Sequence, residues 1–220
     1  MAKTNSIVNR RNFLKKTATV TAATSGLTFL SSTSCQATPP PPPPNDSLNF
    51  VGPKKGYTPQ VGTLVSMMNW MRETILWPVR RGMSIKDLDY LHDDNSNTIG
   101  GMLWHLAATE RFYQLNTFDG RTWGDWPDKD DKEFSVAMSL GDRGRTEIKG
   151  NPLDFYLEKL NRVWDYSLEE LKKRDDEWLL TIDKDWMWSE PTNNYCKWFH
   201  VVEHESNHNG QIKYIKSRIV

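Results

Sequence analysis

The sequence predicts an all-α protein, and more specifically a four-helix bundle with long crossover loops. In four segments, apolar residues recur at steps of three and four, which is the spacing of one face of a helix. No segment shows the sustained apolar–polar alternation of half-buried strands. Four amphipathic helices of this kind bury their apolar faces against one another.

The first two helices are expected at about 59–81 and 97–118. Pro59 near the start of the first helix and Gly82 just past its end follow the usual preference for proline in the first turn and glycine after the last. Thr98 is a suitable N-cap for the second helix, because its hydroxyl can accept a hydrogen bond from an N–H group of the first turn.

The third and fourth helices are expected at about 152–174 and 194–218. The third begins with Pro152 and has the clearest apolar spacing in the chain. The fourth combines apolar residues such as Phe199 and Ile212 with a line of histidines.

Two connections between these helices are longer than a simple turn. The Gly- and Asp-rich stretch 119–151 is expected to be a long loop, and loops of that length are usually functional or disordered. Its Trp123 and Trp126 indicate that part of it packs. The segment 177–190 is expected to form either a short hairpin or a crossover held by its tryptophans.

The first 35 residues have the features of an export signal. Residues 9–16, NRRNFLKK, place two arginines and two lysines before a weakly apolar, small-residue stretch, which is typical of a twin-arginine signal. Threonines and serines interrupt that stretch, and it is shorter than the roughly 20 apolar residues of a transmembrane helix. We therefore expect an exported protein, either periplasmic or anchored to the membrane by an N-terminal lipid.

Cys35 leaves two ways of processing the signal. It lies between small residues and a proline-rich linker, 36–56, as in a bacterial lipoprotein, which would attach a lipid anchor to this cysteine. Ser32 departs from that pattern, since lipoprotein sites usually carry an aliphatic residue there, and the alternative is ordinary peptidase cleavage nearby. In both cases the prolines 39–44 form an extended spacer before a folded domain expected at 57–220.

The charge balance argues against nucleic acid as a partner. The chain has 28 basic and 28 acidic residues, but residues 1–34 hold five of the basic ones and no acid. The rest of the chain is therefore negatively charged, whereas binding to phosphate backbones requires a basic surface. Without Cys35 only Cys196 remains, so no intrachain disulfide can form.

Three of the five histidines, His200, His204 and His208, follow one another at a strict four-residue spacing. Each such step rotates by about 40° in a helix, so the outer two are about 80° apart and all three cannot meet one ion at ideal geometry. The spacing leaves open whether 200/204 or 204/208 is a metal-binding pair. A third ligand could come from His105 in the second helix, whereas His92 lies in an expected loop and is predicted to be solvated.

Each of these features also has a plainer explanation. A lone histidine in an apolar helix is more often a core residue, and an isolated HxxxH pair occurs frequently by chance. Here three histidines share one helix and a fourth lies in another, and bundles build cofactor sites from facing helices. The combination favours a metal site.

The stretches TIGGMLWHLAATE and HVVEHESNHNGQI resemble the DinB-like (DinB/YfiT) superfamily of metalloenzymes, which is unrelated to the DNA polymerase of the same name. The resemblance covers about 60–218 and implies a four-helix bundle with a divalent metal ion bound by His105, His204 and His208. It also implies that His200 lies beside these ligands without binding the metal.

Other residues near these motifs could support the site. Glu110, Glu203 and Gln211 are candidate hydrogen-bond partners that fix the ligand imidazoles, although ordinary helix-surface positions are the alternative. Several tryptophans are expected in the core rather than in a substrate cage: Trp70, Trp77, Trp104, Trp164 and Trp198.

A divalent ion held by three histidines, with zinc or nickel favoured, keeps open positions that can bind water or a thiol. The resemblance implies a thiol-dependent transferase, while the expected export makes a metal-dependent hydrolase equally plausible because small thiols are scarce outside the cytoplasm. The alternative is a non-enzymatic anchored metal-binding or interaction module. A small-molecule substrate is expected, a homodimer stays open, and no catalytic residue can be assigned.

Overall fold

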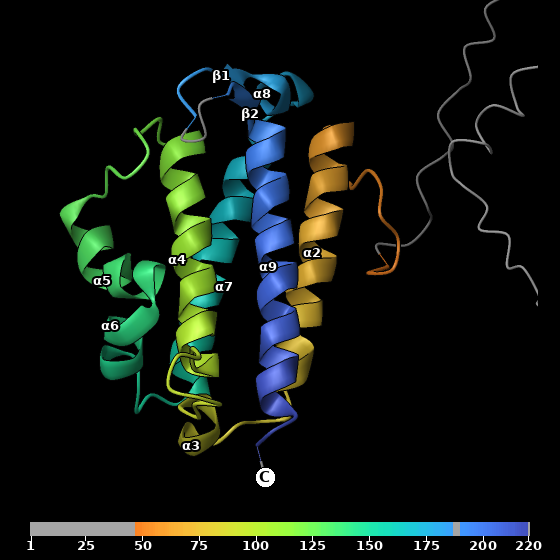
Figure 1. Cartoon of the computed structure of the whole chain (residues 1–220). Helices are drawn as coiled ribbons and strands as arrows, with labels where there is room; N and C mark the ends of the chain where they lie inside the picture. The colour runs from red at the N-terminus through yellow and green to blue at the C-terminus, as the bar shows by residue number, and fades with distance from the viewer. Residues whose placement is uncertain (1–46, 187–189, 220) are drawn as a thin grey trace, which may run out of the picture. The chain divides into compact units, whose positions relative to one another are not determined.

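The structure, a computed structural model, describes residues 47–186 and 190–219. Four long helices lie side by side in it (Figure 1). Their bounds are α2 (Pro59–Val79), α4 (Ile99–Thr117), α7 (Leu153–Leu171) and α9 (Asn194–Lys216). The all-α class is confirmed, and the helices differ from their expected bounds by only a few residues. The predicted signal, Cys35 and the run of prolines fall outside the described residues.

Polar side chains close the N-terminal ends of three of these helices. Thr98 Oγ1 accepts a hydrogen bond from the N–H of Gly101 at 2.9 Å, as the sequence predicts for the start of α4. At the start of α9, Asn193 Oδ1 accepts from the N–H of Cys196 at 2.8 Å. The first turn of α2 donates two N–H groups to Asp176 Oδ1, at 2.9 and 3.1 Å. Each contact satisfies backbone donors that have no partner within their own helix.

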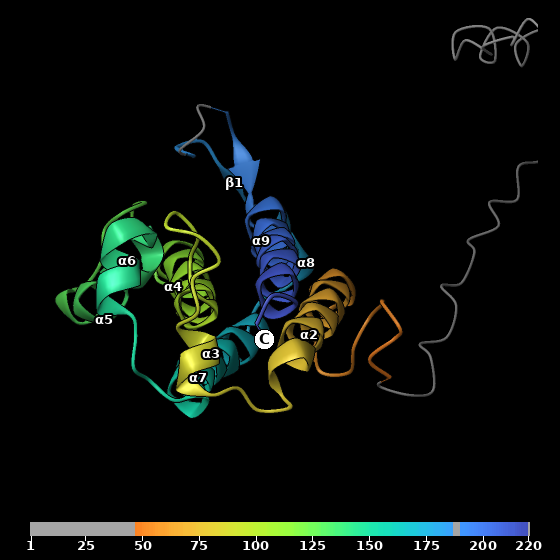
Figure 2. The ribbon, with the colours of Figure 1, turned by 60° about the horizontal axis from the view of Figure 1, so that its bottom comes forward.

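The expectation of a long loop at 119–151 was wrong. This stretch contains α5 (Asp128–Ser139) and α6 (Gly141–Glu147), which pack beside α4 (Figure 2). Only Phe134 and Ala137 of α5 are buried among many charged residues, so the apolar spacing is too sparse to indicate a helix. The expected packing of Trp123 is confirmed, because its ring lies 4.7 Å from that of Phe112.

The other two connections contain short elements of their own. Helix α3 (Ile85–Leu88) precedes α4, and α8 (Asp176–Leu180) follows α7. For the segment 177–190 a hairpin or a crossover was expected. The segment begins within α8, and only its β1 (Ile182–Asp183) pairs antiparallel, with β2 (Thr192–Asn193) beyond the segment, so the expected hairpin is present in part and shifted toward α9. Within the described ranges, no helix is both long and apolar enough to cross a membrane.

The tryptophans divide between the core and the surface. Trp198 is fully buried, as expected, and Trp104 and Trp164 are partly buried. The expectation of burial was wrong for two residues of α2, because Trp70 is 41% exposed and Trp77 is 66% exposed. They are seven residues apart, which puts both on the face of α2 that does not pack against the bundle.

A buried ionic cluster joins all four long helices. The guanidinium of Arg72 on α2 lies 2.6 Å from Glu110 on α4 and 2.9 Å from Glu205 on α9, and it donates to the carbonyl of Leu160 on α7 at 3.1 Å. Ser167 of α7 donates to the second oxygen of Glu110 at 2.6 Å. Burial raises the pKa of Glu205, and the charge of Arg72 opposes that rise. The positive charge of Arg72 therefore favours the charged form of Glu205.

Replacing Arg72 by methionine should destabilise the protein strongly, because two buried carboxylates would lose their positive partner. We expect the free energy of unfolding, measured by urea denaturation, to fall by about 3–5 kcal/mol. The control is Arg143→Ala, which removes an exposed pair with Glu147 and should leave the midpoint unchanged. An Arg72→Met protein as stable as the control would contradict the importance of the cluster.

Candidate metal centre

Two rows of polar side chains face each other along α4 and α9. The rows run in opposite directions with a four-residue spacing in each, and they consist of His105, Thr109 and Tyr113 on α4 and His208, His204 and His200 on α9. Because these positions repeat about once per turn, each row stays on one side of its helix. Apolar residues of both helices, such as Leu106 and Ile212, are buried in the core, and the polar rows meet at the seam between α4 and α9.

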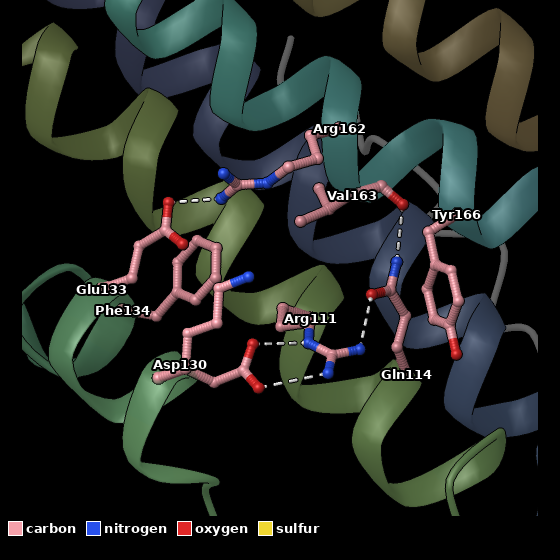
Figure 3. A pocket seen from close by; sticks show the side chains of 9 residues that line it. Arg111, Gln114, Asp130, Glu133, Phe134, Arg162, Val163 and Tyr166 are labelled. Atoms are coloured by element: carbon pink, nitrogen blue, oxygen red, sulfur yellow. Dashed lines mark hydrogen bonds and ion pairs between the residues drawn. The ribbon is translucent and has the colours of Figure 1, made fainter.

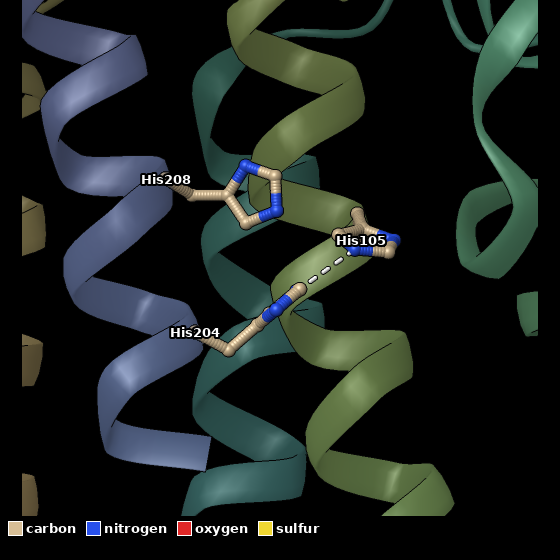
Figure 4. A group of neighbouring side chains, drawn as sticks. All are labelled: His105, His204 and His208. Atoms are coloured by element: carbon tan, nitrogen blue, oxygen red, sulfur yellow. Dashed lines mark hydrogen bonds between the residues drawn. The ribbon is translucent and has the colours of Figure 1, made fainter. Parts of the chain in front are cut away.

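Three histidines converge within this seam (Figure 4). One ring nitrogen from each of His105, His204 and His208 lies within 4.8 Å of the other two. The Nε2 atoms of His105 and His204 are 2.9 Å apart. His208 completes the group, with ring centroids 5.0 Å from His105 and 4.6 Å from His204. We refer to these three residues as the histidine triad.

Hydrogen bonds on the far side of two rings select the nitrogens that face the centre. His105 Nδ1 lies 2.8 Å from the carbonyl oxygen of Ala137 on α5, and a carbonyl can only accept, so Nδ1 carries the proton. His208 Nδ1 lies 3.1 Å from the side-chain oxygen of Gln211 and carries its proton for the same reason. In both neutral rings the lone pair is therefore on Nε2.

The surroundings of the triad keep its rings neutral. Burial is the main cause, and the neighbouring imidazoles add to it; together they lower the pKa of His204 to about 3. Burial and then His105 lower the pKa of His208 to about 4. Burial also lowers the pKa of His105. At neutral pH the triad thus presents uncharged imidazoles, the form that binds metal ions.

This donor set fits a divalent transition metal. Two imidazole nitrogens that each lie about 2.1 Å from one ion, at a right angle, are about 3 Å apart. The separation of 2.9 Å between His105 and His204 is close to that value. Without a cation or a proton between them, two lone pairs at this distance would repel each other. Borderline-soft ions such as zinc and nickel suit imidazole ligands.

The residues that were expected to support the site differ in whether they contact the triad. Gln211 does contact the triad, through His208. His200, one turn before His204 on α9, does not join the triad. Its Nδ1 lies 2.6 Å from the hydroxyl of Tyr113. Glu203 is exposed, and its carboxylate is 4.0 Å from His200.

The expectation that Glu110 fixes a ligand imidazole was wrong. Both of its carboxylate oxygens point into the buried ionic cluster, one to Arg72 and one to Ser167. It follows Thr109 in the chain, and one residue rotates a helix by about 100°, so its side chain leaves the seam and enters the core. Glu110 therefore holds the bundle together instead of orienting an imidazole.

Sequence reasoning missed three groups that shape the site. The carbonyl of Ala137 could not be foreseen, because α5 was expected to be loop. Thr109 and Tyr113 were visible as a four-residue series starting at His105, but that series has meaning only once α9 is known to lie opposite. Thr109 Oγ1 is 3.5 Å from His204 Nε2, and Tyr113 fixes His200.

Comparison with known proteins agrees with this geometry. No curated protein sequence matches the chain. A family model described as mycothiol-S-transferase matches residues 63–219, which include both helices that carry the triad. This family is DinB-like, so the resemblance to that superfamily is confirmed. The chain belongs to the mycothiol-S-transferase family.

Proposed function

We propose that this protein is a metal-dependent S-transferase, which joins a low-molecular-weight thiol to a small electrophilic substrate. One observation carries the proposal: three neutral imidazoles from two helices turn their ring nitrogens toward a common point in a chain that belongs to an S-transferase family. His105, His204 and His208 would hold the ion. A divalent ion in such a site stabilises a bound thiolate, or lowers the pKa of bound water, while three protein ligands leave positions free.

The protein's own residues prepare this site in two ways. Ala137 and Gln211 keep the Nδ1 protons of His105 and His208 away from the centre, so the rings need no rearrangement before binding. The partial burial of the triad limits access of water, which strengthens electrostatic interactions within the site. Helix α5 contributes to both effects, because Ala137 lies against His105. The segment 119–151 thus takes part in the site, which supports an enzyme over a structural module.

Family membership supports the transferase over the hydrolase. The three-histidine geometry by itself serves a hydrolase and a transferase equally well. The description of the matching family names S-transfer from mycothiol, and we carry over the reaction class, thiol transfer, without specifying which thiol this chain uses. Binding of a thiol and of azide to the metal distinguishes S-transfer from hydrolysis and from a non-enzymatic role.

We also propose that the protein is exported through the twin-arginine route. The support is the sequence NRRNFLKK ahead of a weakly apolar stretch and a proline-rich linker. This route carries folded proteins, which suits a domain that binds its metal on folding. Attachment of a lipid anchor to Cys35 belongs to the same proposal.

Substitution of the triad should remove the bound metal. His204→Ala and His208→Ala should each lower the metal content of purified protein to near zero, because two imidazoles are too few to retain the ion against dialysis. His200→Ala should keep most of the metal, since that ring binds Tyr113. His92→Ala serves as a matched control. The metal content of each variant is determined by mass spectrometry. Equal metal content in all four variants would contradict the ligand assignment.

A thiol should bind directly to the metal centre. In cobalt-substituted protein we expect 2-mercaptoethanol and azide both to change the visible spectrum, because three protein ligands leave positions free. A response to azide without a response to the thiol would favour a hydrolase. A spectrum indifferent to both ligands would indicate a closed site and a non-enzymatic module.

Export should depend on the arginine pair. Replacing Arg10 and Arg11 by lysine keeps the charge but removes the twin-arginine pattern, so the protein should accumulate in the cytoplasm. Replacing Lys15 and Lys16 by arginine is the charge-matched control and should not affect export. Fractionation and immunoblotting measure the distribution; normal export of the Arg10→Lys, Arg11→Lys protein would refute this route.

A further inference from the structure

An apolar strip lies on the face of α2 that does not pack against the bundle. Trp70 and Trp77 are both exposed on it, and because they are seven residues apart they lie on the same side of the helix. A single exposed apolar residue is ordinary on a protein surface. Two tryptophans on one face of one helix instead indicate a surface that another molecule covers.

The segment before α2 extends this strip. It returns alongside the helix (Figure 1), and the N–H of Gly52 donates to Ser66 Oγ at 3.0 Å, one turn before Trp70. Phe50 and Val51, which directly precede Gly52, are exposed as well. Large apolar side chains from two segments therefore lie on one side of the molecule. We refer to these residues as the α2 face: Phe50, Val51, Trp70 and Trp77.

The α2 face has a positive charge beside it that no carboxylate neutralises. The guanidinium of Arg81 lies 5.9 Å from the centre of the Trp77 ring, and it forms no ion pair with any residue of 47–186 or 190–219. Glu73 is the one acidic residue of α2, and it is paired with Arg80. An anionic partner would therefore meet exposed aromatic rings and an available cation.

The arginines in the pocket between α4, α5 and α7 offer a contrast (Figure 3). Arg111 binds Asp130 at 2.8 Å, and Arg162 binds Glu133. Their charges are neutralised within the protein, and groups that are already satisfied gain little from a further partner. Arg81 differs from them because its charge remains available.

The membrane surface has the chemistry that matches the α2 face. Tryptophan combines a large apolar ring with a polar N–H group, and it is enriched where proteins meet the boundary between lipid and water. A helix can bind at this boundary through one apolar face without entering the bilayer core. Basic side chains beside that face are attracted to anionic lipids. The α2 face therefore suits a lipid surface that contains anionic headgroups.

The position of the N-terminal linker also favours a membrane as the partner. A lipid attached to Cys35, as proposed above, would be separated from the described part of the chain by the residues 36–47. Twelve residues reach at most about 43 Å, so the domain would stay close to the bilayer. Leu48 lines a cavity together with Ser66 and Glu73 of α2, so the linker joins the domain beside the α2 face.

We propose that the α2 face docks the folded domain onto a lipid surface that contains anionic headgroups. Trp70 and Trp77 insert their rings at the level of the headgroups, and Arg81 pairs with a lipid phosphate. The contribution of the linker rests on the proposed export and lipid attachment, whereas binding of the α2 face to lipid depends only on its own residues. The docking does not involve the histidine triad.

A fluorescent probe on α2 tests the docking. The full chain carries Cys35→Ser and Cys196→Ser, so that no lipid is attached and one introduced cysteine, Thr74→Cys, takes an environment-sensitive dye. Thr74 lies between the two tryptophans on α2. Vesicles of phosphatidylglycerol and phosphatidylethanolamine should shift the emission of this dye to the blue, because docking transfers it from water to the lipid boundary.

The same dye on β1 is the control for this measurement. Ile182→Cys in the same background should show no shift, because binding through the signal segment alone would leave the dye in water. An unshifted emission at Thr74, or equal shifts at both positions, would overturn the proposal.

Substitutions within the α2 face should weaken the binding. Trp70→Ser combined with Trp77→Ser should lower the affinity for these vesicles, measured with the dye at Thr74, at least about tenfold. Ile182→Ser is the matched control and should not change the affinity, because Ile182 is 65% exposed and Trp77 is 66% exposed. Circular dichroism and metal content verify that both variants fold. Equal affinities of the two variants would overturn the proposal.

The charge of Arg81 should determine which lipids bind. Arg81→Gln should lower the affinity for the anionic vesicles about fivefold, which is the contribution of one basic side chain near an anionic surface. Its affinity for phosphatidylcholine vesicles should not change. The same loss on both kinds of vesicle would overturn the preference for anionic headgroups.

Sedimentation velocity without lipid distinguishes a membrane from a second copy of the chain. We expect a monomer, or a dimer that the double tryptophan variant leaves intact. A dimer that dissociates in the Trp70→Ser, Trp77→Ser protein would assign the α2 face to a second copy and overturn the proposal. Metal content and the response of cobalt-substituted protein to a thiol should be the same in all these variants. A failure of docking is therefore distinguishable from a failure of S-transfer.

Discussion

The ionic cluster around Arg72 is the constraint on which the arrangement of the helices depends. One guanidinium binds a carboxylate from α4 and another from α9, and it also reaches the backbone of α7. Buried charges are costly unless they are paired, so sliding or rotating α2, α4 or α9 would leave a charge without its partner. The cluster therefore fixes both the axial register and the rotation of these three helices, and two hydrogen bonds connect α7 to it.

The histidine triad follows directly from that register. Glu205 is the residue after His204, and Glu110 is the residue after Thr109. Each helix thus turns one residue inward to the cluster and the preceding residue outward to the seam, about 100° away. Fixing the two glutamates sets the polar rows of α4 and α9 opposite each other, and a shift of one residue would separate His105 from His204. Ionic contacts in the core thereby position a neutral site at the seam.

The seam has a different chemical character at each end. At the end of the seam that holds His200, this residue and Tyr113 are hydrogen-bonded to each other. The rings of Trp123 and Trp186 pack beside Tyr113. At the other end of the seam, Gln211 accepts a hydrogen bond from His208 Nδ1 at 3.1 Å and is itself exposed. Aromatic rings therefore enclose the seam at the end of His200, whereas polar, exposed side chains lie at the end of His208.

The sequence by itself determined which residues form the four long helices, because apolar spacing, caps and prolines act within a few residues of one another. It also pointed to the line of histidines and to His105. The spacing left open whether His200 and His204 or His204 and His208 meet His105, and only the family resemblance implied the second pair. The tertiary structure brings the second pair to His105, since spacing along one helix does not say which way its neighbour faces. For the same reason it assigned Glu110 to the core, placed Trp70 and Trp77 at the surface, and brought Ala137 of an unforeseen helix to His105. Those outcomes depend on the relative rotation and register of packed helices, which no local pattern encodes.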